Sequence, residues 1–298
     1  MAFILILSML LALTSSCSGE KIVIGSKPFN EQYILAHMIS LLLEEEGLKT
    51  EVQEGLGGTL INYEALLQDQ IEAYVEYTGT AYSVILELPQ KEEWDPEEVY
   101  EATEKGLIEQ DSIAIAANIG FEDSYGIAVK KEWAEENNIK TIADQKGYAK
   151  DMSIGTDPEF ATRADGLPQV EKVYGITFGN TEQMEPTLMY EAIKNDQVDA
   201  ISGYTTDTRI DRFGLVFLED NKNALIPYDA IIIMREETAE NRDILQALKK
   251  LEDKIDTAKM RELNYLYDVE QQEAKDIARN FLVEEDLIEK IGGKYEKI

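Results

Sequence analysis

Two stretches about fifty residues apart carry side chains that could recognise a small charged molecule: residues 26–32 (SKPFNEQ) and residues 76–82 (EYTGTAY). Each follows a strand-like run and opens a helix-like run, which is where open α/β sheets bind ligands. Lys27 offers a cation, Tyr77 a ring, and Thr78 and Thr80 hydroxyl groups. A site with a positive charge and aromatic faces suits a small zwitterion such as a betaine.

The sequence gives little support to catalysis. The single histidine, His37, cannot build a histidine metal site or a triad. The single cysteine, Cys17, falls in the apolar N-terminal segment. Residues 55–58 are glycine-rich but lack the Gly-Lys-Ser/Thr ending of a phosphate loop, which favours a structural turn. We therefore expect no enzyme, no cofactor and no metal site.

The chain has 298 residues, enough for two α/β lobes with cores of their own. With 59 acidic and 28 basic residues its net charge is −31. Such a surface repels nucleic acids and anionic lipids, so we expect neither as a partner. The charge could reflect a saline habitat or an ordinary acidic surface, and both interpretations stay open.

The N-terminal segment predicts export. Residues 1–16 carry no charge, and the apolar run 3–13 has the length of a signal-peptide core but is too short to span a bilayer. Cys17 follows two serines, as the lipid-accepting cysteine of a lipoprotein does. We predict a signal peptide over residues 1–17 and lipid attachment at Cys17, which would hold the protein outside the cytoplasmic membrane. The alternative is a cleaved signal with an incidental cysteine.

The periodicity predicts alternating strands and helices, hence two mostly parallel sheets with helices on their faces. We expect residues 18–123 and 228–298 to form lobe 1 and residues 124–227 to form lobe 2. Because the chain crosses twice, the crossings make a hinge that closes the lobes on a ligand. Strands are expected at 21–25, 50–54, 71–77, 126–129, 153–155, 198–202 and 215–218, followed by an apolar run at 230–234. Helices are expected at 30–46, 60–68, 79–86, 184–197 and through most of 238–291. Another helix is expected to be capped by Asp157 and to begin at Pro158.

Four of the 15 tyrosines stand at strand ends or lobe crossings: Tyr77, Tyr125, Tyr204 and Tyr228. A quaternary ammonium has no N–H to donate, so proteins hold it against aromatic faces. Each tyrosine alone could be a packing residue, but the four together favour a cage. Basic residues are scarce, and Lys27 in a turn with Arg163 at the start of a helix could grip a carboxylate.

Five segments carry a family resemblance. The sequence resembles the substrate-binding proteins of ABC transporters for glycine betaine, proline betaine, choline and carnitine, and within them the archaeal glycine/proline betaine binders. The similarity runs from about Lys21 to the C-terminal helices. Its segments are residues 25–32 (GSKPFNEQ), 55–59 (GLGGT), 75–80 (VEYTGT), 184–193 (MEPTLMYEAI) and 228–233 (YDAIII).

The resemblance implies a bilobed periplasmic-binding-protein fold of the type II kind, with the ligand in the cleft. It also implies a binding site in which tyrosine rings and a backbone carbonyl surround the cation while three side chains hold the carboxylate. The matching cage positions are Tyr77, Tyr125, Tyr204 and Tyr228, with the carbonyl of Asp123. The matching carboxylate positions are Lys27, Thr80 and Arg163.

Thr80 bears on specificity. Some relatives carry an acidic residue there, which would repel a carboxylate and accept the hydroxyl of choline. The neutral Thr80 favours glycine betaine or proline betaine, delivered by a monomeric protein to an ABC permease whose ATPase is a separate subunit. Alternatives are a choline- or carnitine-preferring binder, an osmolyte-sensing receptor domain, and an enzyme with Asp123, Glu159 or Asp207 as its base.

Overall fold

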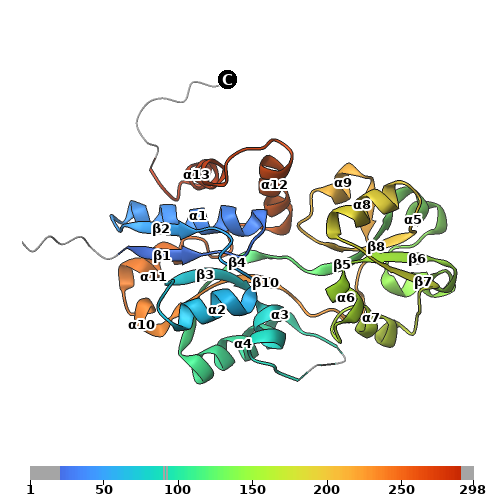
Figure 1. Ribbon diagram of the computed structural model, residues 1–298, viewed down its shortest axis with the longest axis horizontal. Coiled ribbons are helices and arrows are strands. Elements are labelled where there is room, and N and C mark those ends of the chain that lie inside the picture. Colours follow the sequence, from blue (N-terminus) through green and yellow to red (C-terminus); the bar gives the residue numbers. More distant parts are fainter. Residues whose placement is uncertain (1–20, 90, 92, 290–298) are drawn as a thin grey trace, which may run out of the picture.

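The computed structural model describes residues 21–89, 91 and 93–289. The predicted export segment and Cys17 lie outside the described residues. Within them, no helix is long and apolar enough to cross a membrane. Figure 1 shows two sheets side by side, each covered by helices.

Five strands form the first sheet: β1 (Ile22–Gly25), β2 (Thr50–Gln53), β3 (Ala73–Tyr77), β4 (Ile113–Glu122) and β10 (Asp229–Arg235). Their order is β2-β1-β3-β10-β4. Strand β1 runs parallel to β2 and β3, whereas β10 runs antiparallel to β3 and β4. This sheet therefore joins strands from the two ends of the described chain.

The second sheet repeats this pattern with β5 (Tyr125–Lys130), β6 (Ser153–Thr156), β7 (Asn180–Gln183), β8 (Ala200–Tyr204) and β9 (Leu215–Phe217). Their order is β7-β6-β8-β5-β9. Strand β6 is parallel to β7 and β8, and β5 is antiparallel to β8 and β9.

The two-sheet α/β architecture is confirmed, but each sheet is mixed and not mostly parallel. The parallel pairs come from strand–helix–strand units, as parallel pairing requires a long crossover connection. Strands β10 and β5 instead enter their sheets directly from the other sheet. Both strands are therefore antiparallel to their neighbours, and the reversal accompanies the two crossings between the sheets.

Helix α1 (Asn30–Glu45) is the most deeply buried helix of the first lobe, with Ile34, Met38 and Leu42 fully buried. It packs against the sheet and against C-terminal helices (Figure 1). Its burial fixes the position of its first turn, next to Lys27. The other helices of this lobe are α2 (Thr59–Leu67), α3 (Thr78–Thr80), α4 (Pro96–Asp111), α10 (Glu236–Ala239), α11 (Arg242–Lys249), α12 (Thr257–Asp268) and α13 (Ala274–Glu284).

The helices of the second lobe are short. Asp157 caps α6 by accepting a hydrogen bond from the backbone N–H of Phe160 at 3.0 Å, with Pro158 at the first helical position as predicted. The helix predicted at 184–197 is shorter in the structure, where it is α8. These helices are α5 (Lys131–Asn137), α6 (Pro158–Thr162), α7 (Leu167–Tyr174), α8 (Pro186–Lys194) and α9 (Arg209–Arg212).

Each sheet buries apolar side chains on both faces. In β10, Ile232 joins one cluster while Ile231 and Ile233 join another, as alternation along a strand requires. In β5 the same alternation separates Ile127 from Ala128. Among the described residues, the buried clusters do not mix the two sheets, and Tyr125 packs against one cluster on each side. The lobes therefore have separate cores that meet at Tyr125.

The two crossing segments lie side by side. The chain leaves the first sheet after Glu122 and returns to it at Asp229. The backbone N–H of Asp123 donates to the carbonyl of Tyr228 at 3.0 Å, and that of Thr205 donates to the carbonyl of Ser124 at 3.0 Å. Both predicted crossings thus meet at one narrow connection, where a change in the angle between the sheets would be concentrated.

Candidate ligand-binding site

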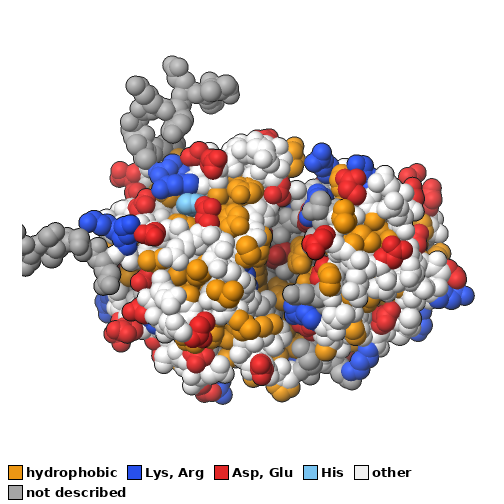
Figure 2. Space-filling view, viewed as in Figure 1, with side chains coloured by type: hydrophobic (Ala, Val, Ile, Leu, Met, Phe, Trp, Pro, Cys, Tyr) orange, Lys and Arg blue, Asp and Glu red, His pale blue; other side chains and the backbone are white. Residues whose placement is uncertain are grey.

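One cavity between the lobes, of about 500 Å³, is lined by all eight residues predicted to bind a ligand. Figure 2 shows the molecule hollowed between its two halves. The cavity also contacts Phe29, Val84 and residues 58–61 at the start of α2, none of which was predicted to bind a ligand. The predicted residues that it brings together are Lys27, Tyr77, Thr80, Asp123, Tyr125, Arg163, Tyr204 and Tyr228.

Three of the four tyrosines form one aromatic group. The ring centroids of Tyr125 and Tyr204 are 4.8 Å apart, and those of Tyr125 and Tyr228 are 6.1 Å apart at 74°. Tyr204 donates a hydrogen bond to the hydroxyl of Tyr125 at 3.1 Å. The cause is register, since Tyr125 begins β5 directly opposite Tyr204 at the end of β8. These rings are fixed by strand pairing.

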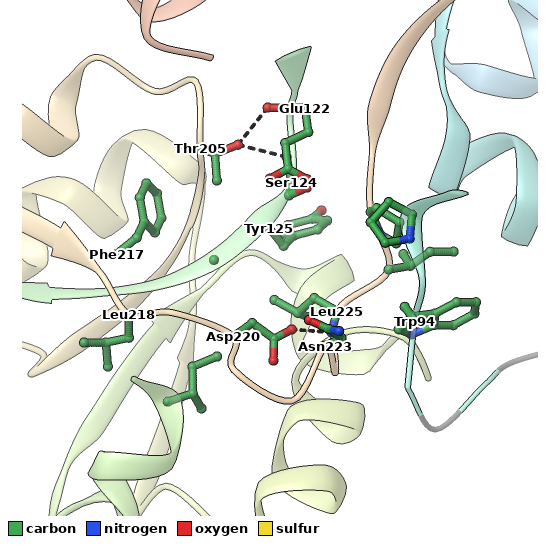
Figure 3. A pocket seen from close by; sticks show the side chains of 15 residues that line it. Trp94, Glu122, Ser124, Tyr125, Thr205, Phe217, Leu218, Asp220, Asn223 and Leu225 are labelled. Atoms are coloured by element: carbon green, nitrogen blue, oxygen red, sulfur yellow. Dashed lines mark hydrogen bonds between the residues drawn. The ribbon is translucent and has the colours of Figure 1, made fainter. Parts of the chain in front are cut away.

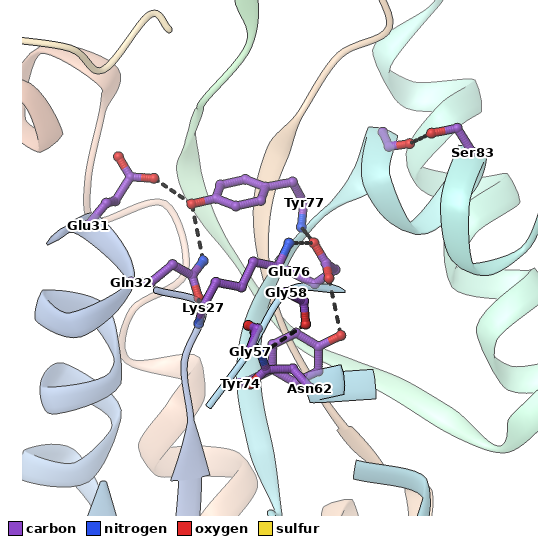
Figure 4. A network of polar contacts seen from close by, with 11 residues as sticks. Lys27, Glu31, Gln32, Gly57, Gly58, Asn62, Tyr74, Glu76, Tyr77 and Ser83 are labelled. Atoms are coloured by element: carbon purple, nitrogen blue, oxygen red, sulfur yellow. Dashed lines mark hydrogen bonds and ion pairs between the residues drawn. The ribbon is translucent and has the colours of Figure 1, made fainter. Parts of the chain in front are cut away.

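Tyr77 enters the cavity from the first lobe, at the end of β3. Its ring stacks near Phe29, with centroids 6.5 Å apart. Its hydroxyl donates to Glu31 at 2.6 Å and accepts from Gln32 at 3.1 Å, so the first turn of α1 holds the ring (Figure 4). Burial raises the pKa of Glu31, and burial with the nearby Glu31 charge raises that of the Tyr77 phenol.

Phe29 was missed, although it lies inside the first predicted stretch. It borders the cavity and precedes α1 directly. Its position next to Lys27 in a strand-to-helix turn was the available signal. A phenylalanine there adds a fifth ring without adding a hydroxyl group.

Lys27 is not a free cation. Its ammonium forms an ion pair with Glu76, whose side chain is fully buried, and lies 5.1 Å from the ring centroid of Tyr77 (Figure 4). Glu76 also accepts from the hydroxyl of Tyr74 at 3.1 Å and from the backbone N–H of Tyr77 at 2.8 Å. Sequence reasoning missed Glu76, even though it immediately precedes Tyr77.

Arg163 is also paired. Its Nε and Nη2 donate to the two carboxylate oxygens of Asp165 at 2.9 and 2.5 Å, and Nη2 donates to the Tyr228 hydroxyl at 3.3 Å. The expected place in the first turns of a helix is wrong: α6 ends at Thr162 and Arg163 follows it. The guanidinium nevertheless reaches the aromatic group because the loop after α6 turns toward the second crossing.

The turn after β3 positions Thr80. The hydroxyl of Thr78 donates to the carbonyl of Pro227 at 3.2 Å and accepts from the backbone N–H of Asp229 at 3.0 Å. A Cβ on Gly79 would lie 2.6 Å from the carbonyl oxygen of Pro227, so only glycine allows this approach. The turn is thereby tied to the second crossing, and Thr80 faces the cavity half-exposed.

Asp123 lies at the first crossing, half-exposed in the cavity. Its carboxylate accepts a hydrogen bond from the hydroxyl of Thr206 at 2.8 Å. Burial, and then the charge of Glu31, raises the pKa of Asp123 well above its usual value. Asp123 also borders a neighbouring cavity of about 680 Å³ that includes Glu31 and Asn264.

A smaller cavity of about 310 Å³ lies on the other side of the crossing (Figure 3). Trp94 contributes to it from the first lobe and Phe217 from the second. Tyr125 borders both this space and the site cavity. Open space on two sides of the crossing leaves room for the lobes to change their angle.

A cavity shared by two α/β lobes and lined by rings and cations defines the class of solute-binding proteins. Residues 20–284 match the family described as the substrate binding domain of ABC-type glycine betaine transport systems. The chain belongs to this family. Binding proteins of ABC importers act outside the cytoplasmic membrane, and permease subunits are their expected partners.

The chain is 31% identical over 283 residues to the ergothioneine transport permease/ergothioneine binding protein EgtU of Helicobacter pylori, covering 94% of this chain and 50% of that protein. It therefore spans half the length of that relative. It is also 31% identical over 276 residues to the carnitine transport binding protein OpuCC of Listeria monocytogenes, covering 91% of this chain and 89% of that one.

The crystal structure of a glycine betaine/carnitine/choline ABC transporter protein is similar with a TM-score of 0.82 and 29% identity, covering 90% of this chain and 99% of that one. The two-lobed fold is thus confirmed. The two relatives described above are bacterial, and the expected likeness to archaeal binders stays a prediction.

Proposed function

We propose that this protein captures a quaternary-ammonium solute carrying a carboxylate, glycine betaine or proline betaine, and delivers it to an ABC permease. The observation that carries this proposal is the single cavity lined by all eight predicted residues, from both lobes. We further propose that residues 18–123 with 228–298 and residues 124–227 move as the two lobes. Neither lobe alone provides both the aromatic group and Tyr77.

In this mechanism the trimethylammonium lies against the rings of Tyr77, Tyr125, Tyr204 and Tyr228. Each desolvated ring contributes about 0.5–2 kcal/mol to holding a cation. The carbonyl of Asp123 adds partial negative charge. The rings are held by strand pairing and by α1, so the cation end needs little reorganisation.

The carboxylate would be held by Arg163, Thr80 and Lys27. Because Lys27 and Arg163 already pair with Glu76 and Asp165, the ligand must share or replace those partners. The guanidinium of Arg163 can grip a carboxylate bidentately, and we expect it to contribute most.

Exposed apolar side chains at the cavity would favour closure of the two lobes. Leu60 and Ile61 line the cavity and are 63% and 57% exposed. Closing the lobes would remove this surface from water, which favours the closed state by about 25 cal/mol per Å². A ligand that contacts both lobes shifts the population in the same direction.

In transport, the protein would work together with membrane subunits. We propose that it is exported by its N-terminal segment, is held at the membrane by a lipid on Cys17, and works as a monomer. A separate ATPase subunit would drive uptake through the permease.

A longer ligand is the second candidate. Two relatives are named for longer ligands, ergothioneine and carnitine. The neighbouring cavity of about 680 Å³ shares Phe29, Asp123 and Tyr204 with the site, so a larger zwitterion has room to extend.

Isothermal titration calorimetry on the protein from Ser18 onward tests both candidates. Glycine betaine, proline betaine, carnitine, ergothioneine and choline are titrated in turn. We expect tight binding of a betaine, weaker binding of choline, and weaker betaine binding in Tyr204→Ala. Choline as the only tight ligand would overturn the role of Thr80, and tight carnitine or ergothioneine would favour the longer ligand.

A further inference from the structure

The carboxylates around the cavity fall into two groups. Glu76, Asp165 and Asp207 each form an ion pair, with Lys27, Arg163 and Arg209 respectively. Glu31 and Asp123 differ from these. In the part of the chain that the structure describes, neither takes part in an ion pair, and neutral groups hold both.

A chain of hydrogen bonds joins these two carboxylates behind the aromatic site. Glu31 accepts from Tyr77 at 2.6 Å and from the amide of Asn264 at 3.1 Å. The same amide donates to the carbonyl of Thr206 at 3.2 Å, and the Thr206 hydroxyl donates to Asp123 at 2.8 Å. Glu31, Asn264 and Thr206 are 1%, 3% and 4% exposed, while Asp123 is half-exposed at the cavity.

The network connects the lobes around the cation end. Glu31 belongs to α1, Asn264 to α12 and Thr206 to the segment after β8, while Asp123 is at the crossing. Glu31 accepts a hydrogen bond from the hydroxyl of Tyr77, one of the predicted cage residues, and Asp123 borders the cavity itself. When ionised, the two carboxylates would therefore place negative charge near a quaternary ammonium bound against these rings.

Glu31 is buried and Asp123 is half-exposed, and two carboxylates this close are costly when both are ionised without a cation beside them. The charge of Glu31 raises the pKa of Asp123, and burial raises the pKa of both groups. The other charged or titratable groups facing them are Tyr77 of β3, Asp207 after β8 and Lys27 after β1; Asp207 raises the pKa of Asp123 and Lys27 lowers it. Arg209, Arg212 and Asp268 line the neighbouring cavity that Glu31 and Asp123 also border.

We propose that Glu31 and Asp123 are the counter-charge that selects a cationic ligand, and that a bound quaternary ammonium expels a proton that this pair holds in the free protein. This inference rests on the proposed function. The carboxyl O–H bond breaks, its proton passes to water or buffer, and the ligand is unchanged. The residues act through charge, as specificity-determining and positioning groups.

The sign of the pH dependence follows. The cation favours the deprotonated pair, so acid favours the free protein. Affinity for glycine betaine falls as pH drops through the pKa of the free pair, by up to about tenfold per pH unit, and is independent of pH above it.

A neutral isostere separates charge from shape. In 3,3-dimethylbutanoate a tert-butyl group replaces the trimethylammonium and the carboxylate stays. Both ligands are titrated calorimetrically from about pH 8 to about pH 5, in two buffers of different ionisation enthalpy, which gives the protons released. We expect glycine betaine to release up to about one proton and to weaken in acid, and the isostere to do neither.

Variants complete the test. Asp123→Asn and Glu31→Gln remove the charges with little change in shape, and either should flatten the pH profile and lower the preference for glycine betaine over the isostere by about tenfold. Glu122→Gln is the matched control, since Glu122 is exposed, adjoins Asp123 and does not line the site cavity. It should leave both quantities unchanged.

The outcomes are distinct. Tight betaine binding with no proton release and no pH dependence in the unaltered protein would overturn the counter-charge while leaving the proposed function intact, and this result needs no variant to fold. Retention of the full preference in a folded Asp123→Asn or Glu31→Gln variant would overturn it as well. No binding of any quaternary ammonium would remove the proposed function itself and this inference with it.

Discussion

The aromatic and basic sides of the cavity are built differently. The rings of Tyr125 and Tyr204 contact one another through strand register, and Tyr77 is held by the first turn of α1. The two cations, Lys27 and Arg163, are instead bound to acids of their own. In the proposed site the cation end is therefore preformed, whereas binding a carboxylate would require Lys27 and Arg163 to exchange partners.

The largest expected effect comes from breaking the buried pair. Glu76→Gln leaves the ammonium of Lys27 buried without its counter-charge, and we expect the free energy of unfolding to fall by about 3–5 kcal/mol. Glu51→Gln is the control, because it breaks the exposed pair with Lys21 and should change stability by less than about 1 kcal/mol. Denaturant unfolding measures both. Equal effects would mean that the Lys27–Glu76 pair is not a structural element.

The next effect concerns Arg163. Arg163→Ala removes hydrogen bonds to a charged group worth about 1.5–3 kcal/mol, so glycine betaine should bind about 10- to 100-fold more weakly. Choline has no carboxylate and should lose little. Calorimetric titration of both ligands gives the comparison, and an equal loss for the two would refute a carboxylate role for Arg163.

A smaller effect is expected at the rings. Tyr204→Ala should weaken glycine betaine by about 0.5–2 kcal/mol, or about 2- to 30-fold, because one aromatic face is lost. Tyr204→Phe keeps the face and removes only the hydrogen bond to Tyr125, so it should bind nearly as the unaltered protein does. If Tyr204→Phe binds as poorly as Tyr204→Ala, the hydroxyl and not the ring is responsible.

The smallest effect is on thermal stability. The pKa values of Glu31 and Asp123 are raised in the folded protein, so their contribution is fully present below the unfolded pKa and is lost as pH rises through the folded pKa. We expect the melting temperature of the ligand-free protein to be lower near pH 8 than near pH 5. The difference should be about 2–4 °C for each kcal/mol by which the free energy of unfolding falls. Asp123→Asn should reduce that difference. A melting temperature that rises over this range in the unaltered protein, and equally in the variant, would contradict the assignment.

Local signals explain what the sequence predicts well. The four tyrosines are recognisable because strand ends are marked by short apolar runs followed by glycine or polar residues. Asp157 and Pro158 mark the start of α6 in the same way. Such features depend on neighbours in the chain, and the structure agrees with them.

Distant pairings explain what was missed. Strand β4, with α4 before it, was not expected. Within the described residues β4 pairs with β10 alone, whose residues follow more than a hundred positions later. Gly120 also interrupts it, with a φ of 108°. The direction of β10 decides whether the sheet is mixed, and nothing local reports that direction.

The buried partner of Lys27 belongs to the same problem. Glu76 lies in a stretch that was singled out, yet its buried pairing with Lys27 depends on how β3 lies beside β1. The chain's alternating pattern predicts neighbouring strands, but not which side chains meet between them.

The most direct test of the central claim is a crystal structure of the protein with glycine betaine. We predict the trimethylammonium against Tyr125, Tyr204 and Tyr228, with the carboxylate on Arg163 after that residue has turned from Asp165. A ligand found outside this cavity, or with its carboxylate against the rings and Arg163 still paired with Asp165, would contradict the account.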